Sequence, residues 1–106
     1  MLNVVMLLPN GRKWDKVPIS TIQYIICHKR LRKLVTIDRE YRLSSSLESI
    51  EAQLPTQQFV RTHKSCIVSV SYISSIGQSE LTVAGTSLPV ARRLRPRLCK
   101  KFAKLC

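Results

Sequence analysis

The stretch FVRTHKSCIVS, residues 59–69, is the part of the chain that most strongly determines the expected fold. Its apolar runs Phe59–Arg61 and Cys66–Val70 are typical of β-strands, and the polar residues between them predict a turn. Arg61 and Lys64 lie on either side of His63, so the turn carries two positive charges. The stretch therefore predicts a strand, a basic turn and a second strand.

Further short strands are expected on both sides of this stretch. They are separated by turn signals such as Asn10-Gly11, in which both residues tolerate a positive φ angle. Many short strands with few helical segments predict a mostly β protein, with two or three small packed sheets, one short internal helix and a basic C-terminal helix. The expected strands are Leu2–Leu8, Lys16–Ile19, Ile22–Cys27, Leu34–Ile37, Tyr41–Leu43, Tyr72–Ile76, Glu80–Ala84 and Thr86–Val90.

The two expected helices have start and stop signals. Ser45 and Glu48 have the spacing of a capping box, in which each residue satisfies a free backbone N–H of the other, and Pro55 stops this helix. The C-terminal helix is expected from about Arg93, with Pro96 in its first turn. The apolar residues at helical spacing are Leu47, Ile50 and Leu54 in the first helix and Leu94, Leu98, Phe102 and Leu105 in the second.

The chain carries a large excess of positive charge. Its 106 residues contain 18 Lys plus Arg against 6 Asp plus Glu, which gives a net charge of +12. This length predicts a single domain, residues 1–106, and self-repulsion of this size favours a polyanionic partner, either nucleic acid or an anionic membrane. The basic clusters are Lys29, Arg30, Arg32 and Lys33; Arg61 and Lys64; and an acid-free cluster of Arg92, Arg93, Arg95, Arg97, Lys100, Lys101 and Lys104.

Membrane and secreted proteins are disfavoured. No apolar run approaches the roughly 20 residues of a membrane span, and Met1–Leu8 lacks the basic start and cleavage site of a secretory signal. The four cysteines form no CxxC pair, so we expect reduced thiols in a cytoplasmic protein. Cys66, Cys99 and Cys106 are expected to act as small core residues.

Metal binding and catalysis are also disfavoured. Cys27, His28, His63 and Cys66 could supply four zinc ligands, but adjacent residues of a strand point to opposite faces. Cys66 with His63 is the one nucleophile–base pair that sequence proximity suggests, and no acid lies nearby to orient it. We therefore expect neither an enzyme, nor a metal, nor a cofactor.

Double-stranded DNA is the expected partner. Aromatic stacking would favour RNA or single strands, but the six aromatic residues mostly lie at core-like positions, and Phe102 alone lies within a basic run. For His63 we favour fixing of the turn, through a backbone carbonyl, over contact with a base edge. Two alternatives stay open: a basic module that binds RNA or a protein partner, and a binder of anionic membranes through Arg93–Cys106.

Residues 59–69 resemble the central motif of the LytTR family of DNA-binding domains, Phe-x-Arg-x-His-Arg-Ser-x-hydrophobic-Val-Asn. Tyr24-Ile25 is similar to the family's upstream strand, Leu47–Leu54 to its short helix, and Leu88–Arg93 to its hydrophobic-Pro-hydrophobic-Ser-Arg-Arg ending. Tyr72-Ile73 follows the central motif at the usual distance. The resemblance implies an elongated arrangement of small antiparallel sheets in a bacterial transcription regulator that binds specific DNA sequences.

The resemblance also implies where DNA is contacted. Loops of the family enter two successive major grooves, with a further contact over the intervening minor groove. The first loop would be His28–Lys33, with Arg32 as base reader; Lys64 would meet the backbone or minor groove; Arg93, beside Arg92, would enter the second major groove. The residues expected at DNA are thus His28, Lys29, Arg30, Arg32, His63, Lys64, Arg92 and Arg93.

Three departures from the family pattern affect individual contacts. Ala91 replaces the usual Ser and so removes a hydroxyl group that could bond a phosphate, Ser69 replaces the usual Asn, and Lys64 stands where Arg or Asn is common. The sequence leaves open a homodimer on repeated sites and an upstream receiver domain or sensor partner.

Overall fold

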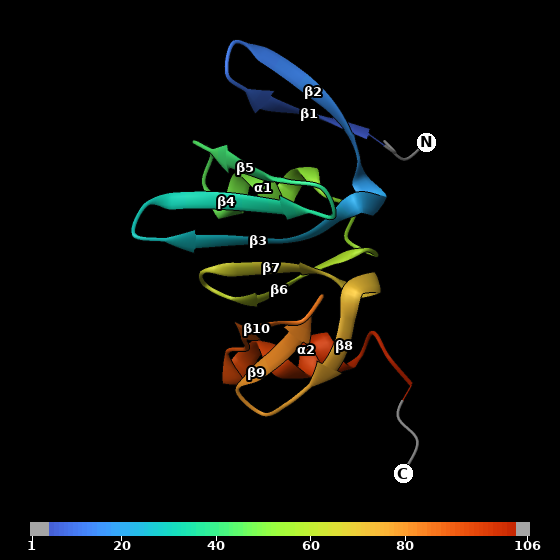
Figure 1. Ribbon diagram of the computed structural model, residues 1–106. Helices are drawn as coiled ribbons and strands as arrows, with labels where there is room; N and C mark the ends of the chain where they lie inside the picture. Colours follow the sequence, from blue (N-terminus) through green and yellow to red (C-terminus); the bar gives the residue numbers. More distant parts are fainter. Residues whose placement is uncertain (1–4, 104–106) are drawn as a thin grey trace.

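The computed structural model describes residues 5–103 and shows an elongated stack of three small antiparallel sheets (Figure 1). Its principal extents are 50 × 34 × 24 Å. A two-stranded hairpin lies at one end, a five-stranded sheet in the middle and a three-stranded sheet at the other end, next to the C-terminal helix (Figure 1). The expected mostly β arrangement of small antiparallel sheets is therefore confirmed.

The strand order shows how the chain builds these sheets. The first sheet pairs β1 with β2, the central sheet has the order β5-β4-β3-β7-β6, and the third has the order β10-β9-β8. The strands are β1 (Val5–Asn10), β2 (Lys13–Pro18), β3 (Ile22–His28), β4 (Leu31–Thr36), β5 (Glu40–Leu43), β6 (Phe59–His63), β7 (Cys66–Ser69), β8 (Ile73–Ile76), β9 (Glu80–Val83) and β10 (Thr86–Pro89). The helices are α1 (Leu47–Gln53) and α2 (Arg95–Cys99), with 3-10 helices η1 (Ile19–Thr21), η2 (Val70–Tyr72) and η3 (Arg92–Leu94).

The first hairpin differs in detail from the expectation. Asn10 pairs with Lys13, so β2 begins three residues earlier than expected and only Gly11 and Arg12 form the turn. Gly11 has a φ of 66°, whereas Asn10 is an extended strand residue. Of the two residues expected to use positive φ, only the glycine does, and the start of the expected strand, Leu2–Val4, lies outside the described residues.

The central sheet is buried on both faces. All four residues of β7 are buried, and its three apolar residues alternate between two hydrophobic clusters. Ile67 joins the cluster that contains α1, whereas Cys66 and Val68 join the cluster that contains β9, β10 and Leu98 of α2. This alternation follows from the two-residue period of a strand, and burial on both faces explains why Cys66–Val68 is a continuous apolar run.

Helix α1 has the expected apolar face but a different cap. Leu47, Ile50 and Leu54 are all buried, and the helix ends just before Pro55. The N-cap is Ser46, whose side-chain oxygen accepts a hydrogen bond from the backbone N–H of Ser49 at 3.2 Å. The capping box expected from Ser45 and Glu48 was therefore wrong by one residue, because two adjacent serines offer the same cap chemistry.

The expected continuation of the C-terminal helix to Phe102 was wrong. Helix α2 ends at Cys99, so Phe102 lies beyond it and is 37% exposed, and Leu105 lies outside the described residues. The aromatic residues were expected to lie mostly at core-like positions, and Trp14 is an exception that is 65% exposed on β2. Within residues 5–103, the two α-helices have seven and five residues, and no helix is long and apolar enough to cross a membrane.

Candidate nucleic-acid interface

Two of the basic turns lie at the same end of the central sheet. In the pairing of β3 with β4, His28 faces Leu31, so the turn consists of Lys29 and Arg30. The antiparallel pairing of β3 with β7 places Ile26 opposite Cys66, and the backbone N–H of Cys27 donates to the Ser65 carbonyl at 2.9 Å. The β3–β4 turn therefore lies next to the β6–β7 turn, and both project from one side of the molecule (Figure 1).

A third basic segment, which follows β10, is attached to the same end by Thr62. This threonine is fully buried, and its hydroxyl group donates to the Pro89 carbonyl at 3.1 Å. Its own carbonyl accepts a hydrogen bond from the backbone N–H of Ala91 at 2.6 Å. Because Ala91 directly precedes η3, the two bonds hold Arg92 and Arg93 beside the end of β6, next to the β6–β7 turn.

Arg61 fixes the shape of the β6–β7 turn. Its Nε donates to the His63 carbonyl at 2.8 Å and its Nη2 to the Lys64 carbonyl at 2.6 Å. The same guanidinium group pairs with Glu51 at 3.1 Å and Glu48 at 3.2 Å, and its side chain is only 12% exposed. The backbone N–H of Glu48 and the Arg61 side chain hold the pKa of the Glu48 carboxyl below its usual value. Arg61 is thus a positioning residue and not an exposed cation.

His63 also fixes this turn, by a different bond from the one expected. Its Nδ1 accepts from the backbone N–H of Ser65 at 3.1 Å and lies 2.8 Å from the Ser65 hydroxyl oxygen. A ring nitrogen that accepts from an amide carries no proton, so in the neutral ring the proton lies on Nε2. Lys64, between these two residues, is exposed at the tip.

The β3–β4 turn has an unusual backbone. Lys29 and Arg30 have φ angles of 52° and 78°, although neither is a glycine or an asparagine. Both are exposed, as is His28, whereas Arg32 is half-buried in β4. The Nη1 of Arg32 donates to the Arg30 carbonyl at 3.3 Å, so the Arg32 side chain stabilises the turn. This is the residue that was expected to read a base.

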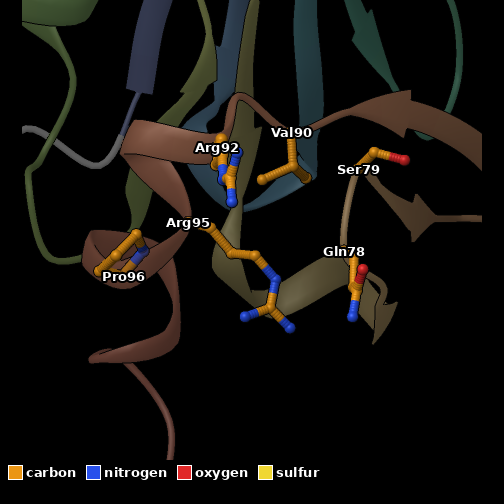
Figure 2. Close-up of a pocket in the computed structure, with 6 residues that line it drawn as sticks. All are labelled: Gln78, Ser79, Val90, Arg92, Arg95 and Pro96. Atoms are coloured by element: carbon orange, nitrogen blue, oxygen red, sulfur yellow. The ribbon is translucent and has the colours of Figure 1, made fainter.

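Arg92 and Arg93 are both exposed but line different clefts. Arg92 lines a cleft with Arg95, Gln78 and neighbouring residues (Figure 2). Arg93 lines a separate cleft with Lys64 and Arg61. The structure therefore joins Arg93 to the β6–β7 turn and directs Arg92 toward the β8–β9 turn, so the two arginines need separate roles.

Folding also changes the charge distribution that the sequence suggested. The cleft lined by Arg93 and Arg97 is lined by Glu48 and Glu51 as well, so the C-terminal cluster is not free of acids in space. Lys101 lies beyond α2, and its ammonium group donates to the Thr56 carbonyl at 2.9 Å. The C-terminal helix was expected to continue to Leu105, so the helical position that this implies for Lys101 was wrong.

Of the cysteines expected in the core, Cys66 is buried there, whereas Cys99 is only half-buried. Cys66 is fully buried, and burial raises the pKa of its thiol to about 11, so the thiolate nucleophile is disfavoured beside His63. Cys27 and Cys99 are free thiols and half-buried; Cys106 lies outside the described residues. Cys27 packs against the α1 cluster and Cys66 in the opposite one. Within residues 5–103, no group of three or more His, Cys, Asp or Glu side chains could hold a metal ion.

Sequence reasoning missed two residues that position the interface. Arg61 was counted with the basic turn residues, yet it pairs with two carboxylates 10 and 13 positions earlier in the chain. The signal was the pair of exposed-face glutamates on α1 without a basic partner in the same helix. Thr62 gave no signal, because its acceptor at Pro89 is 27 residues away and only the tertiary structure brings it near.

The chain is similar to known DNA-binding domains in sequence and in fold. A family model described as LytTr DNA-binding domain matches residues 12–103. The chain is 32% identical over 71 residues to the sensory transduction protein LytT of Bacillus subtilis (strain 168), a match that covers 61% of this chain and 30% of that protein. It is also similar to the LytTr DNA-binding domain of a Bacillus cereus protein named as a methyl-accepting/DNA response regulator. That structure has a TM-score of 0.81 and 25% identity, over 93% of this chain and 96% of the other.

Proposed function

Because the chain belongs to the LytTr DNA-binding domain family, whose members bind DNA in transcription regulation, we propose that it recognises specific sequences in double-stranded DNA. Recognition would use loops rather than a helix. The three loops are the β3–β4 turn, the β6–β7 turn and the Ala91–Arg93 segment. The proposal includes action in the cytoplasm of a bacterium, where the DNA is accessible.

The observation that carries this proposal is the convergence of these three basic loops at one end of the central sheet. The domain is 50 Å long, and its β3–β4 and β6–β7 turns lie on one side of it (Figure 1), so they can face the same DNA duplex. The loops would meet two successive major grooves and the minor groove between them. A merely solubilising surface would not need to hold its cations with Thr62 and Arg61.

Each loop has a separate proposed role. Lys29 and Arg30, with His28 and Arg32 at the turn's base, would enter the first major groove. Lys64 would meet the backbone across the minor groove, and the Nε2–H of His63 adds a donor there. Arg93 would enter the second major groove, where its guanidinium group can bond two acceptors of one guanine.

Two measurements test DNA binding itself. Selection of random duplexes against the purified domain should yield a defined motif. Contacts to roughly 5–8 phosphates should give a log–log salt slope of about −4.5 to −7. Duplex RNA and single strands serve as competitors; a preference for either, or a slope near zero on duplex DNA, would favour the alternative of a basic RNA- or protein-binding module.

Two substitutions test the loop roles. Arg93→Ala should cost about 1–3 kcal/mol on the selected motif and relax the preference at one base pair. Lys64→Ala should weaken selected and random duplexes alike and reduce the salt slope by about one. Arg39→Ala removes the same charge at the opposite end of β4 and should change neither binding property. If Arg93→Ala weakens all duplexes equally, Arg93 does not read a base.

A further inference from the structure

The cleft that Arg92 lines is also lined by a second arginine, Arg95. It has a volume of about 560 Å³ and lies between the β8–β9 turn and the start of α2. Figure 2 shows Arg92, Arg95 and Gln78 among the residues that line this cleft, with the side chains of Arg95 and Gln78 extending to the same side. The residues that line it are Gln78, Ser79, Val90, Arg92, Arg95 and Pro96, so no carboxylate is among them.

Backbone contacts hold this arrangement in place. The Nε of Arg95 donates to the Gly77 carbonyl at 2.9 Å, which orients the guanidinium group, and its two terminal nitrogens make no hydrogen bond to residues 5–103. The backbone N–H of Val90 donates to the Ser79 carbonyl at 2.9 Å and joins the two walls of the cleft. Neither arginine has a salt bridge within residues 5–103.

Two unpaired guanidinium groups around one hollow repel each other, and an anion between them removes that cost. Planar guanidinium donors suit the oxygens of a phosphate, and the Gln78 amide adds a neutral donor. Arg92 is adjacent to Arg93 in η3, although the two side chains line different clefts. On the proposed function, a phosphate bound here would belong to the backbone of the DNA that Arg93 contacts.

We propose that Arg92, Arg95 and Gln78 form a binding site for one backbone phosphate of the DNA. This inference rests on the proposed function. The ligand group is a phosphate diester, and its contact with Arg95 is an addition to the eight residues expected from the sequence.

The experiment compares Arg95→Gln and Gln78→Glu with the wild type and with Arg39→Gln, an arginine at the opposite end of β4. Gln78→Glu places a carboxylate in the cleft and keeps the Arg95–Gly77 bond, so it controls for loss of that bond. Both cleft variants should bind selected and random duplexes about tenfold more weakly, with Arg95→Gln lowering the salt slope by about 0.9. Arg39→Gln should match the wild type, and thermal melting shows whether each variant is folded.

Duplexes with single methylphosphonate substitutions locate the phosphate. Methylphosphonate at one position should lower the affinity of the wild type for the duplex about tenfold. The same substitution should leave the affinity of Arg95→Gln unchanged, because this variant has already lost the contact with that phosphate. The inference is overturned if both cleft variants bind DNA like the wild type, or if every methylphosphonate weakens Arg95→Gln as much as the wild type. Inorganic phosphate that stabilises the wild type but not Arg95→Gln, with unchanged DNA binding, would show a site for a free anion instead. A wild type that binds no duplex would refute the proposed function as well.

Discussion

The tip of the β3–β4 turn offers a test that separates folding from DNA binding. Lys29 and Arg30 form a two-residue hairpin turn in which both central residues have positive φ angles. Turns of this kind favour Asn-Gly, because these residues tolerate positive φ without the steric conflict of a larger side chain. The double substitution Lys29→Asn with Arg30→Gly should therefore stabilise the protein while it weakens DNA binding.

The magnitude follows from the backbone. An L-residue other than glycine in this conformation costs about 1–2 kcal/mol, and Asn-Gly removes most of that cost at two positions. Glycine reduces this gain by roughly 0.5–1 kcal/mol, because its backbone has more conformational freedom to lose from the unfolded chain. The net gain is about 1–2 kcal/mol, which raises the melting temperature of a domain of this size by about 4–16 °C. Loss of two cations at the DNA lowers the salt slope by about 1.8.

The β9–β10 turn provides a matched control. Ala84 and Gly85 have φ angles of 50° and 81°, so Ala84→Asn relieves the same strain in a turn without a charged residue. It should raise the melting temperature and leave DNA affinity unchanged. Thermal melting and salt titrations of duplex binding measure the two effects.

One result would refute the strain in the turn, and another would refute its contact with DNA. If the double variant melts at or below the wild-type temperature, the turn is not strained. If it melts higher and binds DNA with the wild-type affinity and salt slope, Lys29 and Arg30 do not contact DNA.

Three further predictions concern the interior. Arg61→Lys keeps the charge but loses the donors to the His63 and Lys64 carbonyls, so urea unfolding should show a loss of about 1–3 kcal/mol, whereas Arg39→Lys, on the exposed surface, should show little change. Burial raises the pKa of the Cys66 thiol to about 11, so as the pH rises this thiol ionises in the unfolded chain before it ionises in the folded protein. The free energy of unfolding should therefore keep the full contribution of this thiol below about pH 9 and lose roughly 2–3 kcal/mol as the pH rises toward 11. Cys66→Ala should remove this fall between about pH 9 and 11 from a plot of the free energy of unfolding against pH. A plot that keeps the same fall would show that ionisation of Cys66 does not cause it. A chelator should leave the melting temperature unchanged. A lower melting temperature after chelation, together with stoichiometric zinc in the untreated protein, would reveal a metal site.

The sequence was informative wherever the relevant signal was local. Strand period, turn residues and the apolar face of α1 depend on neighbours within a few positions, and these predicted the mostly β fold and the three basic loops. Local signals failed where two neighbours offered the same chemistry, as with Ser45 and Ser46, or where helical spacing continued past the end of a helix, as at Phe102.

The sequence by itself therefore determined the class of fold, the large positive charge and the similarity to the LytTR motif. Only the tertiary structure decided which cations are exposed and which are used inside the protein. Arg61 and Lys64 look alike in the sequence, yet Arg61 is held by two carboxylates and two carbonyls while Lys64 is exposed. The physical reason is that a side chain's partners are set by the strand register and by contacts such as Thr62 with Pro89, which join residues far apart in the chain.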